Sequence, residues 1–338
     1  ELWIASAEAN KPAQPFQIKP FHEAFFKSVI HAWKERDKKW VYNLKRKEKK
    51  EFEAAFFKAI PNLPAPLRKA LTGPKEVSFS ASFNNFGALE IVETAALTDE
   101  KFDILHRFGR VFDLSYTRFN DLQKAEAQTR EAQIELAMER VRARSMAMHR
   151  SEELSDVVAL LFEEIKPFGF ASSGIELILP DEHNDILQFW MTSTAHNKVA
   201  ECFNIPRTIH PFFQKTWKAW KDQLPRLTLR LEGQEKKKFD RLILTKTDFK
   251  QLPEEVKQFI LNSGYQDVFS SAIMKHGILE SVDTEPISDV QFVILERFAK
   301  VFEQSYTRFL DLQKAEAQAR EAQVEVAMER VRAATMAM

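Results

Sequence analysis

The sequence predicts an α+β protein in which domains built from an antiparallel sheet with flanking helices are joined by long coiled-coil-type helices. Two observations carry this prediction. Residues 115–148 and 305–338 form a charged, helix-forming segment that occurs twice and differs at six of 34 positions. Ahead of each copy, segments with strand and helix periodicity follow one another in a similar order. A length of 338 residues also suits roughly two domains of about 150 residues each.

The repeat continues more faintly through the domain that precedes each helix. An offset of 187 aligns Phe25-Phe26 with Phe212-Phe213, and an offset of 190 aligns Gly87 with Gly277. We therefore divide the chain into an incomplete domain at 1–104, a linker helix at 105–150, a complete domain at 151–294 and a second linker helix at 295–338. The first copy begins at the equivalent of the second strand. We expect its opening helix and first strand upstream of residue 1, and a further domain beyond Met338.

The sequence of the complete domain predicts the following elements in order. Ser151 is a candidate N-cap for a helix over 152–166. Strands are expected at 174–179 and 186–194, then a helix over 210–222, a mixed stretch, and a helix over 253–262. Two further strands follow at 267–275 and 277–283. A capping box of Ser288 and Gln291, with Ile287 and Phe292 as its hydrophobic staple, starts the long final helix.

The linker helix carries an apolar residue at every seventh position. A seven-residue period on an otherwise charged helix is typical of a coiled-coil seam, so we expect each linker to pair with its twin in a homodimer. A single solvated helix that only spaces the domains is the alternative, because the companion seam positions are mostly charged or small. The expected seam residues are Ala127, Ile134, Val141 and Met148 in the first copy, and Ala317, Val324, Val331 and Met338 in the second.

Composition excludes several classes of function. Lys plus Arg and Asp plus Glu both number 49, so no basic excess points to nucleic acid. The basic run at 45–50 contains an acid and is read as a solvated helix face. The sequence contains no run of about 18 apolar residues, the length that would indicate a membrane span. The single cysteine, Cys202, excludes an internal disulfide framework and favours a cytoplasmic setting.

The order of elements resembles a GAF domain, most clearly at the end of each copy. His276-Gly277-Ile-Leu-Glu280, Ile287-Ser288-Asp289 and the segment 292–298 are similar to the last hairpin and exit helix of that family. The linker segment 327–333 and the junction 146–154 resemble the signalling helices of tandem GAF arrays in bacterial sensor histidine kinases. The resemblance implies a two-component signalling protein with small-ligand sensors and an output domain further along the chain.

Departures from the family bear on the cofactor. The Asn-Lys-Phe-Asp-Glu pattern of cyclic-nucleotide GAF domains is absent, and Cys202 is followed by Phe203 and not by the His of bilin-binding domains. We find no signal for a metal, a bilin or a nucleotide, so the cofactor is unknown. A simply filled core is the preferred interpretation of the repeated aromatic residues, and a ligand cavity under the sheet is the alternative. The residues that would line this cavity are Trp190, Phe213 and Trp220 in the second copy, and Trp3, Phe26 and Trp33 in the first.

No catalytic constellation is present. His149 precedes Arg-Ser-Glu-Glu but lacks the following Pro and the ATP-binding domain of a kinase. The sequence therefore predicts a non-enzymatic sensor segment that passes a signal along dimeric helices, with no nucleic-acid partner and no membrane contact. The alternative is a ligand-free scaffold in which degenerate GAF domains only space and dimerise the chain.

Overall fold

The computed structural model describes residues 2–4, 14–17, 19–61, 63, 65–170, 174–192 and 200–336. The chain divides into two compact units, residues 1–128 and 129–338. Each unit combines helices with antiparallel sheet, which confirms the predicted α+β class. The boundary falls inside a single helix, α4, which runs from Asp99 to Met146. Its 48 residues correspond to about 72 Å at 1.5 Å per residue.

Unit 2 is built on a six-stranded sheet in the order β8-β7-β6-β11-β10-β9, and every neighbouring pair is antiparallel. β6 (Gly174–Asp181) and β11 (Gly277–Asp283) are central, and Leu177 lies opposite Leu279 in their register. β8 and β9 are the edges. The remaining strands are β7 (Ile186–Thr192), β8 (Ala200–Pro206), β9 (Arg226–Glu232) and β10 (Gln266–Met274).

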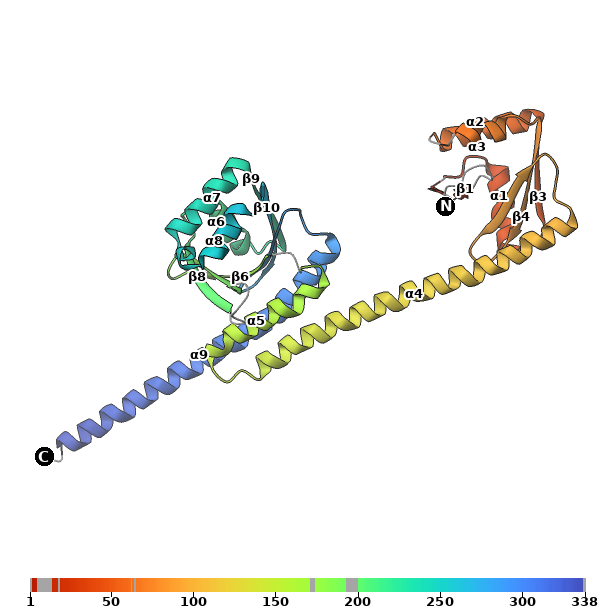
Figure 1. The fold of residues 1–338 in the computed structure, drawn as a ribbon. Coiled ribbons are helices and arrows are strands. Elements are labelled where there is room, and N and C mark those ends of the chain that lie inside the picture. Colours follow the sequence, from red (N-terminus) through yellow and green to blue (C-terminus); the bar gives the residue numbers. More distant parts are fainter. Residues whose placement is uncertain are drawn as a thin grey trace. The chain divides into compact units, whose positions relative to one another are not determined.

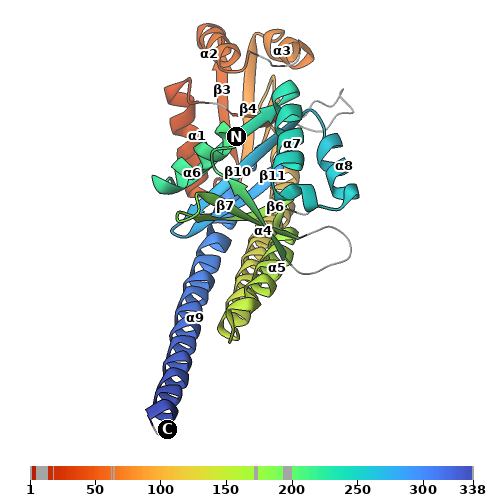
Figure 2. The same ribbon diagram turned by 90° about the vertical axis from the view of Figure 1, so that its left-hand side faces the viewer.

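Helices cover both faces of this sheet (Figure 1). α6 (Pro211–Lys221), α7 (Gly233–Lys246) and α8 (Glu254–Asn262) lie over one face. α5 (Leu154–Ile165), α9 (Asp289–Met336) and the end of α4 lie over the other, as Figure 2 shows from the side. Because successive side chains of a strand point to opposite faces, Leu177 and Leu179 pack against α5 and α9 while Ile178 packs under α6 and α7.

Gly277 is required by a close approach between the two central strands. A Cβ atom at this position would lie 2.5 Å from the carbonyl oxygen of Ile178 and 2.8 Å from Cδ2 of Leu179. Gly277 is the first residue of β11, as the strand expected at 277–283 predicts, and it pairs with Met274. The lack of space for a side chain at this position, and not a turn, explains why residue 277 is a glycine.

Helix starts agree with the sequence at one end of the domain and not at the other. Ser288 and Gln291 form the predicted capping box: the Gln291 amide donates to Ser288 Oγ over 3.3 Å, and the Ser288 amide donates to Gln291 Oε1 over 2.9 Å. The N-cap prediction for Ser151 is wrong, because residues 151–153 form a 3-10 turn and α5 begins at Leu154. Glu153 satisfies the free amides there, accepting from His149 and Arg150 over 3.1 Å each.

The structure also fills the mixed stretch of the sequence. β9 and α7 occupy residues 226–246, and β8 precedes α6 at 200–206, none of which the sequence analysis identified. Short 3-10 turns follow α5 at Lys166–Phe168 and α7 at Asp248–Gln251.

Unit 1 repeats the order of unit 2 from β7 onward. Its elements are β1 (Leu2–Ile4), β2 (Gln14–Phe16), α1 (Glu23–Glu35), β3 (Trp40–Lys45), α2 (Arg46–Ala59), α3 (Ala65–Thr72), β4 (Glu76–Phe83) and β5 (Ala88–Glu93), followed by α4. β1-β2 and β3-β4-β5 form separate sheets. In unit 2 the strand β6 joins the two halves, and the described part of unit 1 has no strand in that position.

A buried lysine is repeated at the same place in both units. Lys236 of α7 donates to Asp240 over 2.7 Å, approaches Asp267 of β10 at 3.0 Å and donates to Ser263 after α8 over 2.9 Å. Lys49 of α2 likewise pairs with the acid four residues on, Glu53, and donates to the carbonyl of Leu71 over 2.9 Å. Each lysine links a covering helix to neighbouring elements through directional hydrogen bonds and ion pairs. A purely apolar side chain at this position would not fix the orientation of the helix in this way.

The two units differ in the face that α5 covers. In unit 2 the first turns of α9 are buried, and these turns carry Ile294, Phe298, Val301 and Phe302. At the equivalent positions of α4, 190 residues earlier, the side chains of Ile104, Phe108, Val111 and Phe112 are exposed. No helix occupies the place of α5 among the described residues of unit 1. The exit helix of this fold therefore has an apolar face that a first helix is needed to cover.

Candidate functional site

The end of α4 is part of the main core of unit 2. Ile134, Met138, Val141 and Met148 are each at most 3% exposed, and they belong to one apolar cluster with residues of α5 and α9. α4 and α5 run as a helical hairpin beside the first half of α9 (Figure 1). Partners in this cluster include Val158, Leu161 and Phe162 of α5 and Phe298 and Phe302 of α9.

Ion pairs surround this three-helix contact. Arg297 of α9 donates to Glu131 over 2.7 Å and to Glu135 over 2.6 Å, both on α4. The hydrogen bond from Arg297 lowers the pKa of Glu131. Arg144 of α4 bridges to Glu153 over 3.0 Å and to Asp156 over 2.7 Å. The side chains of these pairs are partly solvent-exposed, so the pairs fix the register of the helices more than they add stability.

Three of the predicted seam residues, Ile134, Val141 and Met148, are buried within the chain, because α5 folds back along this face immediately after the turn at 147–150. Pairing of a linker helix with its twin stays a prediction. Outside this contact, Ala127, Ala317 and Val324 are exposed. Val331 lies in α9, and Met338 lies outside the described residues.

The aromatic ligand candidates of unit 2 do not converge on one cavity. Phe213 and Trp220 pack in the cluster under α6 and α7. Trp190 packs against the opposite face of the sheet, with α5 and α9. Strand alternation explains this split, since the neighbouring Phe189 of β7 points to the α6 side. The indole N–H of Trp190 is buried and has no hydrogen-bond partner among the described residues.

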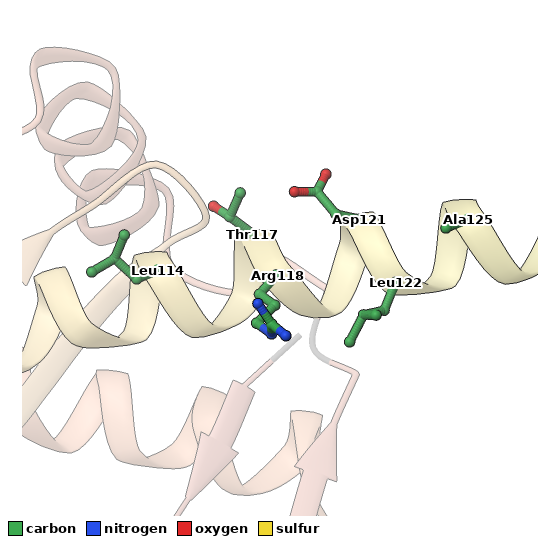
Figure 3. A pocket seen from close by; sticks show the side chains of 6 residues that line it. All are labelled: Leu114, Thr117, Arg118, Asp121, Leu122 and Ala125. Atoms are coloured by element: carbon green, nitrogen blue, oxygen red, sulfur yellow. The ribbon is translucent and has the colours of Figure 1, made fainter.

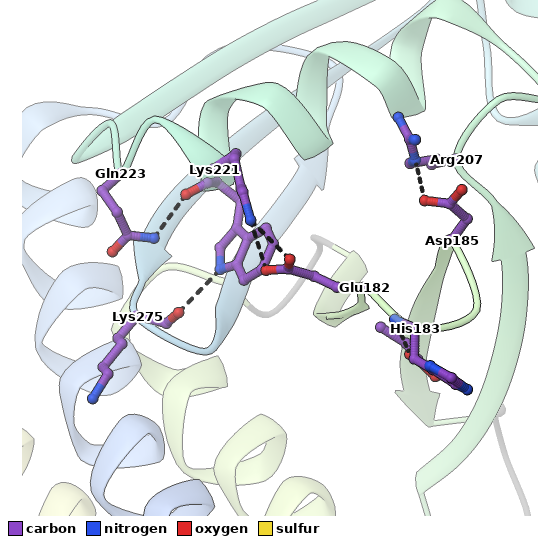
Figure 4. A network of polar contacts seen from close by, with 9 residues as sticks. Glu182, His183, Asp185, Arg207, Lys221, Gln223 and Lys275 are labelled. Carbon is purple, nitrogen blue, oxygen red and sulfur yellow. Dashed lines mark hydrogen bonds and ion pairs between the residues drawn. The ribbon is translucent and has the colours of Figure 1, made fainter.

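Trp220 has a structural partner. Its indole N–H donates to the carbonyl of Lys275 over 3.1 Å, and its own carbonyl accepts from Gln223 Nε2 over 2.7 Å (Figure 4). Lys221 lies 5.7 Å from the indole ring and pairs with Glu182 over 2.8 Å. This network fastens α6 to the hairpins at 181–185 and 274–277, so Trp220 holds the domain together at this corner.

In unit 1 the corresponding aromatics are dispersed. Phe26 is partly buried and contacts Phe21 and Phe25 edge-on, with ring centroids 5.2 and 5.5 Å apart. Trp33 is exposed, and the Arg36 guanidinium lies 5.6 Å from its ring. Trp3 lies in β1. The described contacts do not bring these residues around a common space.

Two carboxyl groups face the aromatic cluster from the middle of the sheet, and sequence reasoning missed them. Glu176 of β6 and Glu280 of β11 are register partners, and Ser271 of β10 donates to Glu280 over 2.5 Å. Burial raises the pKa of Glu280 to about 7. Burial, with the negative charges of Glu280 and Asp267, raises the pKa of Glu176 to about 8. An acid at the fourth residue of the apolar strand Gly277-Ile-Leu-Glu280 was the signal in the sequence.

These carboxyls are the chemically distinctive feature of the domain interior. Glu280 is fully buried, and its Oε1 has no hydrogen-bond partner among the described residues. The buried ammonium of Lys236, on the covering helix α7, is already shared by Asp240 and Asp267. A proton or a hydrogen-bond-donating group is what such a pair accepts most favourably.

A hollow of about 410 Å³ lies along α4, lined by Leu114, Thr117, Arg118, Asp121, Leu122 and Ala125 (Figure 3). All six lining residues come from one helix, on successive turns. No second wall is formed by the described residues, so the hollow does not enclose a ligand in the way that binding sites for small molecules do.

Metal and thiol chemistry find no support in the described part of the chain. No group of three His, Cys, Asp or Glu side chains is placed to hold a metal ion there. Loss of hydration and the nearby Asp248 raise the pKa of the Cys202 thiol to about 11, which keeps it protonated near neutral pH. None of the described helices combines the length and the apolar character that crossing a membrane requires.

Comparison with known proteins adds no assignment: no family model matches this sequence, and no curated protein matches it.

Proposed function

We propose that this chain is a sensory and signal-transmission segment of a larger signalling protein, such as a sensor histidine kinase, with GAF-like domains that bind a small ligand or a partner. Each exit helix carries the state of its domain into the next domain. The burial of Ile134, Met138 and Val141 of α4 within unit 2 is the observation that carries this proposal.

The coupling follows from the continuity of α4. Near its start, Phe102 and Leu105 pack with Leu97 in unit 1, and its end is part of the core of unit 2. Because a change in the packing of one end alters a helix that the other unit needs for its own core, the two units share a structural element. A ligand shifts this equilibrium only by its differential affinity for the two helix arrangements.

The ligand that the interior of unit 2 favours has a hydrogen-bond donor or a positive charge. Glu176 and Glu280 supply acceptors on the sheet face that α6 and α7 cover. The GAF-like order of elements supports a ligand site on the same face of the sheet, because the helical middle of the domain covers that face.

A ligand-free spacer is the second candidate function, and the aromatic packing favours it. Phe212, Phe213, Phe239 and Phe269 contact one another with centroids 4.5–6.3 Å apart, which is the geometry of a filled core.

A binding screen followed by hydrogen exchange separates the two functions. A small-molecule library that contains amines is screened by thermal shift on the wild-type chain and on the matched variant Glu280→Gln. If the domain is a sensor, a compound raises the unfolding temperature of wild type more than that of the variant, and its binding changes amide exchange at 134–145. If no compound binds, and native mass spectrometry finds no copurified molecule, the spacer stands and the sensor proposal fails.

A further inference from the structure

The far half of α9 carries a second copy of a surface that is buried elsewhere in the chain. Residues 131–148 and 321–338 differ at four of 18 positions. In α4 the stripe of Ile134, Ala137 and Met138 is covered by α5 and α9. At the matching positions of α9, Val324 and Met328 are about half exposed, at 52% and 51%, and Ala327 is exposed as well.

The charges around the stripe are repeated too. In α4, Glu131 and Glu135 bind Arg297, and Arg140 approaches Glu164 of α5 at 3.3 Å. Their counterparts in α9 are Glu321, Glu325 and Arg330, all exposed and without an ion pair among the described residues. The same surface is thus present twice, once with its partner and once without.

We propose that this α9 stripe, defined as Val324, Ala327 and Met328 with Glu321, Glu325 and Arg330, docks onto another domain of the same kind. Its occupant is the helix pair equivalent to α5 and the start of α9. The partner presents an apolar face like that of Leu161, Phe162 and Phe298, a basic residue in the place of Arg297 and a carboxylate in the place of Glu164. This contact does not depend on ligand binding.

A twin helix fits the stripe less well. In a parallel pair with the seam at Ala317, Val324 and Val331, the second seam position falls on Arg320, and Glu316 of one helix faces Glu321 of the other. A seam with a buried guanidinium and facing like charges is destabilised. The domain partner avoids both, because in α4 the counterpart of Arg320, Arg130, stays exposed beside the contact, and the counterpart of Glu321, Glu131, pairs with Arg297.

In the test, the α9 segment is added as a separate peptide to the 338-residue chain carrying Ile134→Asp and Val141→Asp. These two substitutions loosen the packing of the end of α4. Fluorescent peptides 313–338 and 123–148 are titrated by anisotropy. We expect the two to bind within about tenfold of each other, and at least tenfold more weakly to wild type, where α4 occupies the face. Val324→Asp with Met328→Asp in peptide 313–338 should weaken binding by at least tenfold. Ala334→Arg should tighten it roughly two- to fivefold, since Arg144 bridges to α5.

Each other outcome contradicts the proposal. Binding of 123–148 without binding of 313–338 shows that the surface is specific to α4. Self-association of 313–338 that is indifferent to the chain, seen by sedimentation, assigns the stripe to a twin helix. If the charged variant unfolds by circular dichroism, the chain with Ile134→Ala and Val141→Ala replaces it. Absence of binding by both peptides to that folded chain also overturns the proposal, which requires a face that accepts a helix in trans.

Discussion

The repeated helix supplies its own control for a stability experiment. Ile134 of α4 is 3% exposed, whereas Val324, its counterpart in α9, is 52% exposed within a nearly identical sequence. Ile134→Ala removes buried methyl and methylene groups from the core of unit 2, a change that typically costs about 2–5 kcal/mol. Val324→Ala removes side-chain groups from a solvated face, where the effect is usually within about 0.5 kcal/mol and the higher helix propensity of Ala offsets part of it.

The assay is urea unfolding of the full chain, with hydrogen exchange of α5 as the local reporter for unit 2. A loss of about 2–5 kcal/mol in a unit of this size lowers the midpoint of thermal unfolding by roughly 4–20 °C. We expect that loss for Ile134→Ala and almost none for Val324→Ala. Equal small effects would refute the burial of α4 in unit 2, and equal large effects would mean that α9 is covered by a partner in solution.

Three further predictions test the interior of unit 2. Because the pKa of Glu280 is raised from 4.5 to about 7, the folded chain holds more protons than the unfolded chain between these values, and stability falls as pH rises through this range. Glu280→Gln should therefore match wild type near pH 4.5 and exceed it by about 3 kcal/mol at pH 8.5 in urea unfolding; an equal difference at both pH values would contradict the burial of this carboxyl. Gly277→Ala should destabilise by about 1–3 kcal/mol because its Cβ meets backbone, whereas Gly109→Ala in α4 should stabilise by up to about 1 kcal/mol, and calorimetry giving both the same sign would refute the close approach. Lys236→Met should cost about 3–5 kcal/mol by leaving two carboxylates unpaired, and the added Asp240→Asn should recover part of that loss; a single substitution without effect on the unfolding midpoint would show that the pair is not buried.

Sequence patterns predicted the elements whose signal is local. The repeat, the hairpin of β10 and β11 and the capping box at Ser288 depend on neighbouring residues, and all three are present in the structure. β9 was missed although its leucines alternate at 227, 229 and 231, because the polar and charged residues around them, Arg226, Thr228, Arg230 and Glu232, are also typical of a loop. α7 was missed because six of its first nine residues are charged.

The candidate site was harder to predict, because periodicity identifies a face and not what covers it. The seven-residue spacing selected Ile134, Val141 and Met148, which are indeed packing residues. Their partners, α5 and α9, were invisible to a pattern read along one helix. Trp190 was grouped with Trp220 because both aromatics recur in the two copies, but strand alternation puts Trp190 on the opposite face from Phe189, which packs in the same cluster as Trp220.

The most direct test of the account is native-state hydrogen exchange on the unmodified chain, comparing amides 134–145 of α4 with amides 324–335 of α9. The two segments share eight of 12 residues, and the differences that remain after correction for intrinsic exchange rates report the free energy of local opening. We predict that 134–145 exchange at least about a hundredfold more slowly, which corresponds to roughly 3 kcal/mol. Equal exchange in the two segments would contradict the claim that the end of α4 belongs to the core of unit 2.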